Sequence, residues 1–96
     1  MYAIAFDLDT ETLKGAYGNQ SWNNAYADIR KALEARNFDW QQGSLYFGQK
    51  EVNAVSCVLA VVHLKRTFPW FEASVRDIRM LRIEELNDLR PAIAAG

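Results

Sequence analysis

Cysteine, histidine and proline are scarce in this chain of 96 residues, which contains one cysteine, one histidine and two prolines. A single cysteine, Cys57, excludes an intrachain disulfide, and no spacing of cysteine and histidine is typical of a zinc site. Cys57 lies in an apolar run, where a buried and unreactive thiol is typical. His63 lies toward the end of the same run, so we expect a packed or surface residue rather than a catalytic one.

The chain also lacks an excess of charge, since 11 basic and 12 acidic residues give a formal net charge of −1. Proteins that bind DNA usually carry a basic excess, so the net charge of this chain does not favour tight binding of nucleic acid. A brief catalytic encounter with RNA remains compatible with it, and any attraction to phosphate must then come from a local group of basic residues. The opening MYAIAF has no basic start and no long apolar stretch. We therefore expect neither a secretory signal nor a membrane span, and a cytoplasmic location.

The composition is typical of a folded globular protein, with half of the residues hydrophobic and about a quarter charged. Its length suits one compact domain over residues 1–96 and leaves no room for a second. A domain of this size buries only about 60–65% of its unfolded surface, so pairing with a second copy would add stability. We therefore expect a homodimer.

Alternating and helical patterns of apolar residues predict the order strand, helix, strand, strand, helix, strand. The predicted segments are a strand at 2–9, a loop at 10–20, a helix from Ser21 to about Arg36, a hairpin over 37–48, a helix from about Gln49 to Arg66, a strand at 74–84 and a tail at 86–96. This βαββαβ order is typical of an α+β, ferredoxin-like sandwich with sheet order 4-1-3-2 and two helices on one face of an antiparallel sheet. The tail could add a strand or reach a partner as an arm.

The first predicted strand has two unlike faces. Large residues alternate with small or acidic ones, namely Tyr2, Ile4, Phe6 and Leu8 with Ala3, Ala5, Asp7 and Asp9. Successive side chains of a strand point to opposite faces, so the large residues should meet the helices. A second copy packing on the flat alanine face is the simplest way to cover it.

Asp7 is the sharpest candidate for a functional residue, because a carboxylate in an apolar strand is costly unless it is paired, hydrated or functional. The sheet order brings the end of the first strand beside the beginnings of the third and fourth, so Asp7 should lie near Ser44, Arg76 and Asp77. Beside a symmetry mate, Asp7 could share a proton or hold a divalent cation such as Mg²⁺, and either suits phosphodiester cleavage. The alternative is a carboxylate that caps the strand end or pairs with an arginine.

The three residues predicted to lie near Asp7 each have an ordinary alternative. Ser44 could bind a phosphate oxygen or a ribose 2′-OH, or it could be a turn hydroxyl that bonds its own backbone. Arg76 could bind phosphate with Asp77 orienting it, or both could be the charges usual on an edge strand. Aromatic residues are expected mostly in the core or an interface, with base stacking open for one or two exposed ones: Trp22, Tyr26, Phe38, Trp40, Trp70 and Phe71.

Four segments, MYAIAFDL, AYADI, QGSLY and SVRDIRMLRIE, occur in the order and spacing of the VapD family, which the chain resembles over most of its length. The resemblance implies a ferredoxin-like dimer, related in fold to the CRISPR-associated Cas2 proteins, with ribonuclease activity. It implies functional roles for Asp7 at the end of the first strand, Ser44 in the GS pair and Asp77 in SVRDIR. Leu13 corresponds loosely to a family loop position, and is carried over as a substrate-binding candidate together with Arg76.

The resemblance favours an endoribonuclease that cleaves single-stranded RNA and acts as the toxin of a toxin–antitoxin pair, with a small protein antitoxin as a further partner. The alternative is a non-catalytic, Cas2-like dimer that serves as a scaffold for nucleic acid or protein. Asp9 and Glu11 are additional acids in this chain, which could repel RNA or help to hold a cation.

Overall fold

The computed structural model describes residues 1–18 and 20–95, so Asn19 in the predicted loop and Gly96 at the end of the predicted tail lie outside the described residues. In chain order the elements are β1 (Tyr2–Leu8), α1 (Thr10–Tyr17), α2 (Asn24–Glu34), β2 (Phe38–Gln42), β3 (Leu45–Gly48), α3 (Ala54–Thr67), α4 (Phe71–Ser74), β4 (Val75–Arg82) and α5 (Arg90–Ala95). No helix in this described part is long and apolar enough to cross a membrane.

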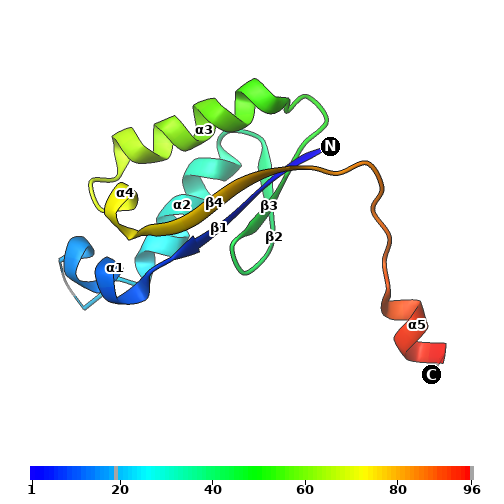
Figure 1. Cartoon of the computed structure of the whole chain (residues 1–96), viewed down its shortest axis with the longest axis horizontal. Coiled ribbons are helices and arrows are strands. Elements are labelled where there is room, and N and C mark those ends of the chain that lie inside the picture. Colours follow the sequence, from blue (N-terminus) through cyan, green and yellow to red (C-terminus); the bar gives the residue numbers. More distant parts are fainter. Residues whose placement is uncertain (19, 96) are drawn as a thin grey trace.

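The four strands form one antiparallel sheet in the order β2-β3-β1-β4. Read from the β4 edge, this is the predicted order 4-1-3-2, so the predicted α+β topology is confirmed. Strand β1 lies between β3 and β4, which puts the end of β1 beside the starts of both neighbours (Figure 1).

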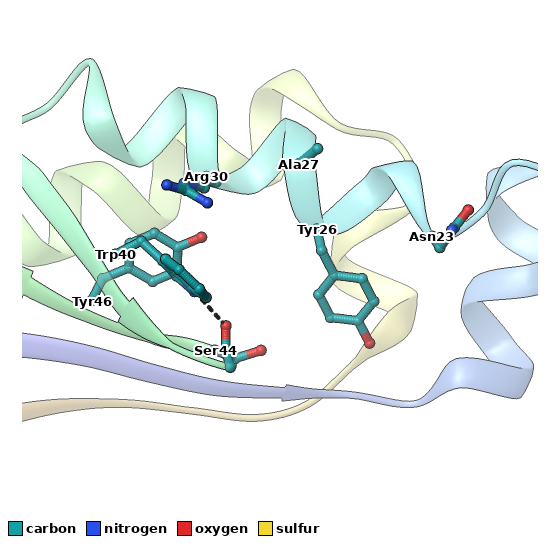
Figure 2. A pocket seen from close by; sticks show the side chains of 8 residues that line it. Asn23, Tyr26, Ala27, Arg30, Trp40, Ser44 and Tyr46 are labelled. Carbon is teal, nitrogen blue, oxygen red and sulfur yellow. Dashed lines mark hydrogen bonds between the residues drawn. The ribbon is translucent and has the colours of Figure 1, made fainter.

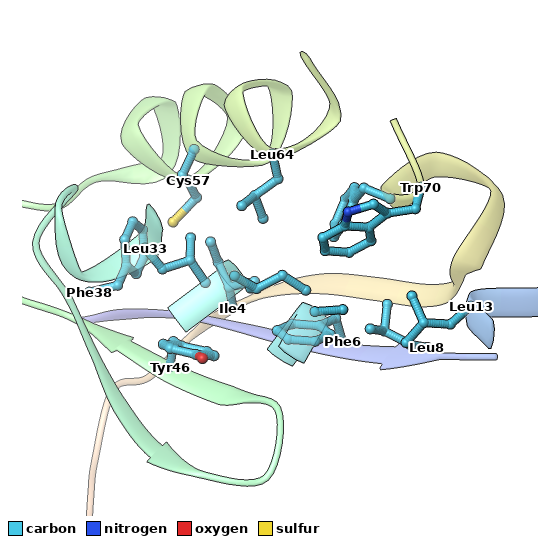
Figure 3. Packing of buried hydrophobic residues seen from close by; sticks show 14 of the residues in the cluster. Ile4, Phe6, Leu8, Leu13, Leu33, Phe38, Tyr46, Cys57, Leu64 and Trp70 are labelled. Carbon is cyan, nitrogen blue, oxygen red and sulfur yellow. The ribbon is translucent and has the colours of Figure 1, made fainter. Parts of the chain in front are cut away.

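Helices α2 and α3 cover one face of the sheet, and the hydrophobic core lies between the two layers (Figure 3). As predicted, Ile4, Phe6 and Leu8 point into this core and are buried. Burial of each such side chain contributes roughly 1.5–3 kcal/mol of transfer free energy. Cys57 is buried too, and burial raises the pKa of its thiol, as expected for an unreactive cysteine.

The segment predicted as a loop at 10–20 is largely a helix, α1, so this part of the prediction is wrong. Asp9 is its N-cap, and the Asp9 side chain accepts hydrogen bonds from the backbone N–H groups of Glu11 and Thr12. The helix ends at Gly18, which has a φ of 84°. Gly15 and Gly18 suggested a loop, but the cap and the buried Leu13 outweigh the low helix propensity of one internal glycine.

Both long helices begin later than predicted. Helix α2 begins at Asn24 rather than at Ser21, after a turn in which the Asn24 N–H donates to the Ser21 carbonyl. Helix α3 begins at Ala54 rather than near Gln49, because Asn53 and Ser56 form a reciprocal capping box. The short helix α4, between α3 and β4, was not predicted.

The tail does not add a strand to the sheet, which corrects one of the two expectations for it. Beyond β4 the chain runs on without regular structure and then forms α5, whose residues are all exposed over the part described (Figure 1). The other expectation, an arm that reaches a partner, stays a prediction.

Candidate active site

A β-bulge positions the charged groups at the end of β1. In the β1–β4 ladder, Asp7 is opposite Asp77 and Leu8 is opposite Val75, so Arg76 is the additional residue on β4. Bulges commonly redirect a side chain, and this one leaves the Arg76 guanidinium between two carboxylates. Its two terminal nitrogens lie 3.6 Å from Asp7 Oδ2 and 3.6 Å from Asp9 Oδ2.

The pairing of Asp7 with Arg76 is loose and open to solvent. The side chains of Asp7 and Arg76 are 59% and 62% exposed, and their separation of 3.6 Å is longer than a good charge-assisted hydrogen bond. Ion pairs of this kind contribute about 0–1 kcal/mol, so a bound phosphate could readily compete for the guanidinium. The alternative given for Asp7, a carboxylate that pairs with an arginine, is therefore observed, but this pairing does not lock Asp7 away from a ligand.

Asp77 does not orient Arg76, contrary to the prediction. Its two carboxylate oxygens each accept a hydrogen bond of 3.1 Å from Nε of Arg79. Because residues opposite each other in a ladder share a face, Asp77 and Asp7 are neighbours across the two strands. Asp77 therefore contributes negative charge next to Asp7 and holds Arg79 in place.

Ser44 reaches the same end of the sheet through its backbone. The Ser44 carbonyl accepts a hydrogen bond of 3.1 Å from the N–H of Phe6, the residue before Asp7. This bond fixes the turn between β2 and β3 against β1, as the topology predicted. The Ser44 side chain is half-buried and lines a groove between the hairpin and α2.

This groove has a volume of about 500 Å³, within the usual range for small-ligand sites. Side chains from α2 and from the hairpin line it, and Figure 2 shows the rings of Tyr26 and Trp40 on either side of Ser44. Partial burial raises the pKa of the Tyr26 hydroxyl, and the nearby Asp7 carboxylate raises it further. Tyr26 therefore lines the groove and also experiences the charge of Asp7.

The structure places Leu13 away from this surface. Its side chain is 0% exposed and belongs to the core below α1. A substrate cannot touch it in this conformation, so Leu13 positions α1, and through it Asp9, rather than contacting substrate. His63 on α3 is half-buried and lines a separate hollow with Arg36 and Arg66.

A metal site is not preformed within one copy of the chain. Among residues 1–18 and 20–95, no group of three or more histidine, cysteine, aspartate or glutamate side chains is arranged to hold an ion. The carboxylates of Asp7 and Asp9 share the Arg76 guanidinium instead. If Mg²⁺ acts here, Asp7 is the side chain that would bind it.

Sequence reasoning missed Arg30, and it named Tyr26 and Trp40 only among six aromatic residues of which one or two could stack on bases. Tyr26 and Arg30 are one helical turn apart on α2, a spacing that puts both on one face. Trp40 lies two residues after Phe38 on β2 and therefore on the same face, which indicated packing. An exposed aromatic on an edge strand facing an i, i+4 tyrosine–arginine pair was the signal available in the sequence.

The chain is similar over nearly its whole length to curated endoribonucleases, although no protein-family model matches it. It is 53% identical over 93 residues to the endoribonuclease VapD homolog of Helicobacter pylori, covering 97% of this chain and 96% of the relative. It is 48% identical over 94 residues to endoribonuclease VapD 2 of Riemerella anatipestifer, covering 98% and 100%. It is 42% identical over 96 residues to endoribonuclease VapD of Dichelobacter nodosus, covering 100% and 99%. The chain therefore belongs to the VapD family of endoribonucleases.

Proposed function

We propose that this chain is an endoribonuclease that cleaves single-stranded RNA in the cytoplasm, acting through one domain that spans residues 1–96. Family membership supports the activity. The observation that carries the assignment of the site is the convergence of Asp7, Arg76 and Ser44 at one end of the sheet, next to a groove of about 500 Å³.

In the proposed reaction Asp7 is the general base, which takes a proton from the attacking ribose 2′-OH or from water. The new bond forms between that oxygen and phosphorus, the bond from phosphorus to the 5′-oxygen breaks, and the 5′-oxygen leaves as a hydroxyl after taking a proton from solvent water. Arg76 leaves its loose pairing with Asp7 and Asp9 to bind the phosphate, and its charge stabilises the transition state. Ser44 donates a hydrogen bond to the phosphate or the ribose.

Two groups tune this arrangement. The Tyr26 hydroxyl is protonated at neutral pH, as tyrosine ordinarily is, so it can donate a hydrogen bond to a phosphate oxygen. Asp77 holds Arg79 by hydrogen bonds of 3.1 Å, which keeps that second guanidinium from neutralising Asp7. Asp77 is thus a positioning residue in this proposal.

We further propose a homodimer formed by the sheet face opposite to α2 and α3. Five small or apolar residues lie on this face: Ala3, Ala5, Leu45, Phe47 and Leu81. Leu81 is 41% exposed, and a second copy packed on this face would bury it. A second copy packed there would also bring a second Asp7 close to the first.

A role as the toxin of a toxin–antitoxin pair is part of the same proposal, since cleavage of cellular RNA arrests growth. A small protein antitoxin would then bind and block the enzyme. Growth arrest on expression of the wild-type chain but not of Asp7→Asn tests this role, and a protein that relieves the arrest and co-purifies with the chain would identify the antitoxin.

The cleavage test compares Asp7→Asn with Asp9→Asn on one single-stranded RNA, with and without a chelator. Each variant removes one of the two carboxylates beside Arg76, and asparagine at position 9 still caps α1. We expect Asp7→Asn to lower kcat/KM by about 10²- to 10⁴-fold and Asp9→Asn by less than 10-fold. Equal cleavage by the wild type and Asp7→Asn would mean that the activity is a contaminant. Binding of RNA without turnover would favour the non-catalytic scaffold.

A further inference from the structure

Trp40 is exposed and yet held in one orientation. Its indole Nε1 donates a hydrogen bond of 2.8 Å to the Gly43 carbonyl in the adjacent turn. The side chain is 41% exposed on the edge strand β2. An indole ring that is fixed and open to solvent offers a flat surface to a ligand.

Arg30 orients the same ring from α2. Its guanidinium carbon lies 4.4 Å from the centroid of the Trp40 ring, in a cation–π contact. Glu34, one turn further along α2, pairs with Arg30 at 3.5 Å. Arg30 and Trp40 both line the groove, and Trp40 stays 41% exposed with Arg30 on its ring.

The groove beside Trp40 is lined by aromatic, basic and hydroxyl side chains, the types that bind a nucleotide. Figure 2 shows Tyr26 and Trp40 separated by a gap above Ser44, with Arg30 over the tryptophan. Its volume of about 500 Å³ suffices for one nucleotide.

We propose that Trp40 is the base-stacking platform of this enzyme, and that an unpaired RNA base lies on its indole within the groove. The inference rests on the proposed function and assigns the residues that select single-stranded substrate. In this proposal the ribose of the stacked nucleotide lies near Ser44, which lines the groove. Bases in a duplex are already paired and stacked, so a duplex cannot use this platform.

The proposed platform also explains how a chain with a formal net charge of −1 could hold RNA. Stacking does not depend on charge, and every base has a π-face, so it supplies affinity where phosphate attraction is weak. Arg30 contributes local positive charge at the rim of the groove.

Binding without turnover tests this inference in an Asp7→Asn background. The probes are a fluorescent single-stranded RNA of ten nucleotides and a ribose–phosphate strand of the same length that lacks bases. Trp40→Leu removes the aromatic surface, and Trp40→Phe retains a ring. Arg30→Gln is compared with Arg66→Gln, which removes the same charge from an exposed site on α3. Thermal unfolding of each variant shows whether it is folded.

We expect Trp40→Leu to weaken binding of the base-containing RNA by about 5- to 100-fold and to leave binding of the abasic strand unchanged. Trp40→Phe should keep most of the affinity, and Arg30→Gln should lose more than Arg66→Gln. The inference is overturned if folded Trp40→Leu binds the base-containing RNA as tightly as its parent, or if the parent does not distinguish the two probes.

The outcome for the platform is separate from the outcome for catalysis. If the wild type cleaves no RNA but the preference for bases depends on Trp40, the proposed function fails and the platform stands. If the wild type cleaves RNA and Trp40→Leu leaves KM unchanged for single-stranded substrate, the platform fails and the proposed function stands.

Discussion

Asp7 and Asp77 lie directly opposite each other in the β1–β4 ladder, and each has its own arginine. Arg76 lies 3.6 Å from Asp7, and Arg79 donates hydrogen bonds of 3.1 Å to Asp77. Like charges placed opposite each other are unfavourable, so the two arginines compensate an arrangement that packing alone does not explain. The cost is consistent with a functional site at this end of the sheet.

This relationship predicts an unusual double-variant result. Asp77→Asn frees Arg79, which lies on the same face as Asp7 and can pair with it. We expect kcat/KM for RNA cleavage to fall by about 10-fold, since the proposed base would be partly neutralised. Adding Arg79→Gln should restore most of the activity. If the double variant is no more active than Asp77→Asn alone, Asp77 acts in some way other than by holding Arg79.

Asp9 predicts a pH dependence for the stability of α1. Its pKa is lowered, first by the hydrogen bond from the Thr12 N–H and then by the charge of Arg76, against an opposing effect of desolvation. A group whose folded pKa is depressed stabilises the fold above its unfolded pKa of about 3.9, and this contribution is lost as pH falls through the folded value. At pH 7 we therefore expect Asp9→Ala to have a lower Tm than the wild type. The difference should shrink below about pH 4.

Asp9→Asn is the matched control for that titration, because asparagine caps a helix without titrating. Relative to Asp9→Ala, its Tm advantage should persist down to pH 2. A gap between wild type and Asp9→Ala that stayed constant from pH 7 to pH 2 would contradict the assignment.

Replacement by alanine should have opposite effects on stability at Gly48 and at Gly15. A Cβ on Gly48 would lie 2.6 Å from Cγ1 of Val52 and 3.1 Å from the Tyr2 carbonyl oxygen, so Gly48→Ala should destabilise the fold by about 1–3 kcal/mol. A Cβ on Gly15 would meet nothing within 4 Å, and Gly15 lies inside α1. Gly15→Ala should therefore stabilise by about 0.5–1 kcal/mol. Denaturant unfolding of both variants measures the two effects, and a stable Gly48→Ala would show that Val52 moves aside easily.

The sequence predicts the sheet well because its information is local and strongly periodic. Alternation in residues 2–9 defines the buried face of β1, and the resulting order of strands brings Asp7 and Ser44 to one end of the sheet. Helix ends were predicted less well. Several polar residues near the start of α3 could have been its N-cap, and in the structure this residue is Asn53. Only the folded chain shows which polar residue finds backbone N–H groups to accept from.

The partners of the charged residues could not be predicted, because they depend on a bulge of one residue. Without it Arg76 would point to the opposite face from Asp77, and the guanidinium could not lie between Asp7 and Asp9. The groove was missed for a related reason. Whether Trp40 is buried or exposed depends on its position at the sheet edge and on the distance of α2 from the hairpin.

If the proposed dimer forms through the sheet face opposite to α2 and α3, a charge introduced on that face should break it. Leu81 is 41% exposed there, so in a monomer Leu81→Asp would cost little, whereas in a dimer it buries a charge. We expect Leu81→Asp to weaken dimerisation by at least 100-fold with little change in far-UV circular dichroism. Leu59→Asp is the matched control, because Leu59 is 53% exposed on α3, on the other side of the molecule. Sedimentation over a range of concentrations measures both. A dimer lost with Leu59→Asp but kept with Leu81→Asp would move the interface to α3, and Asp7 would then have no symmetry mate beside it.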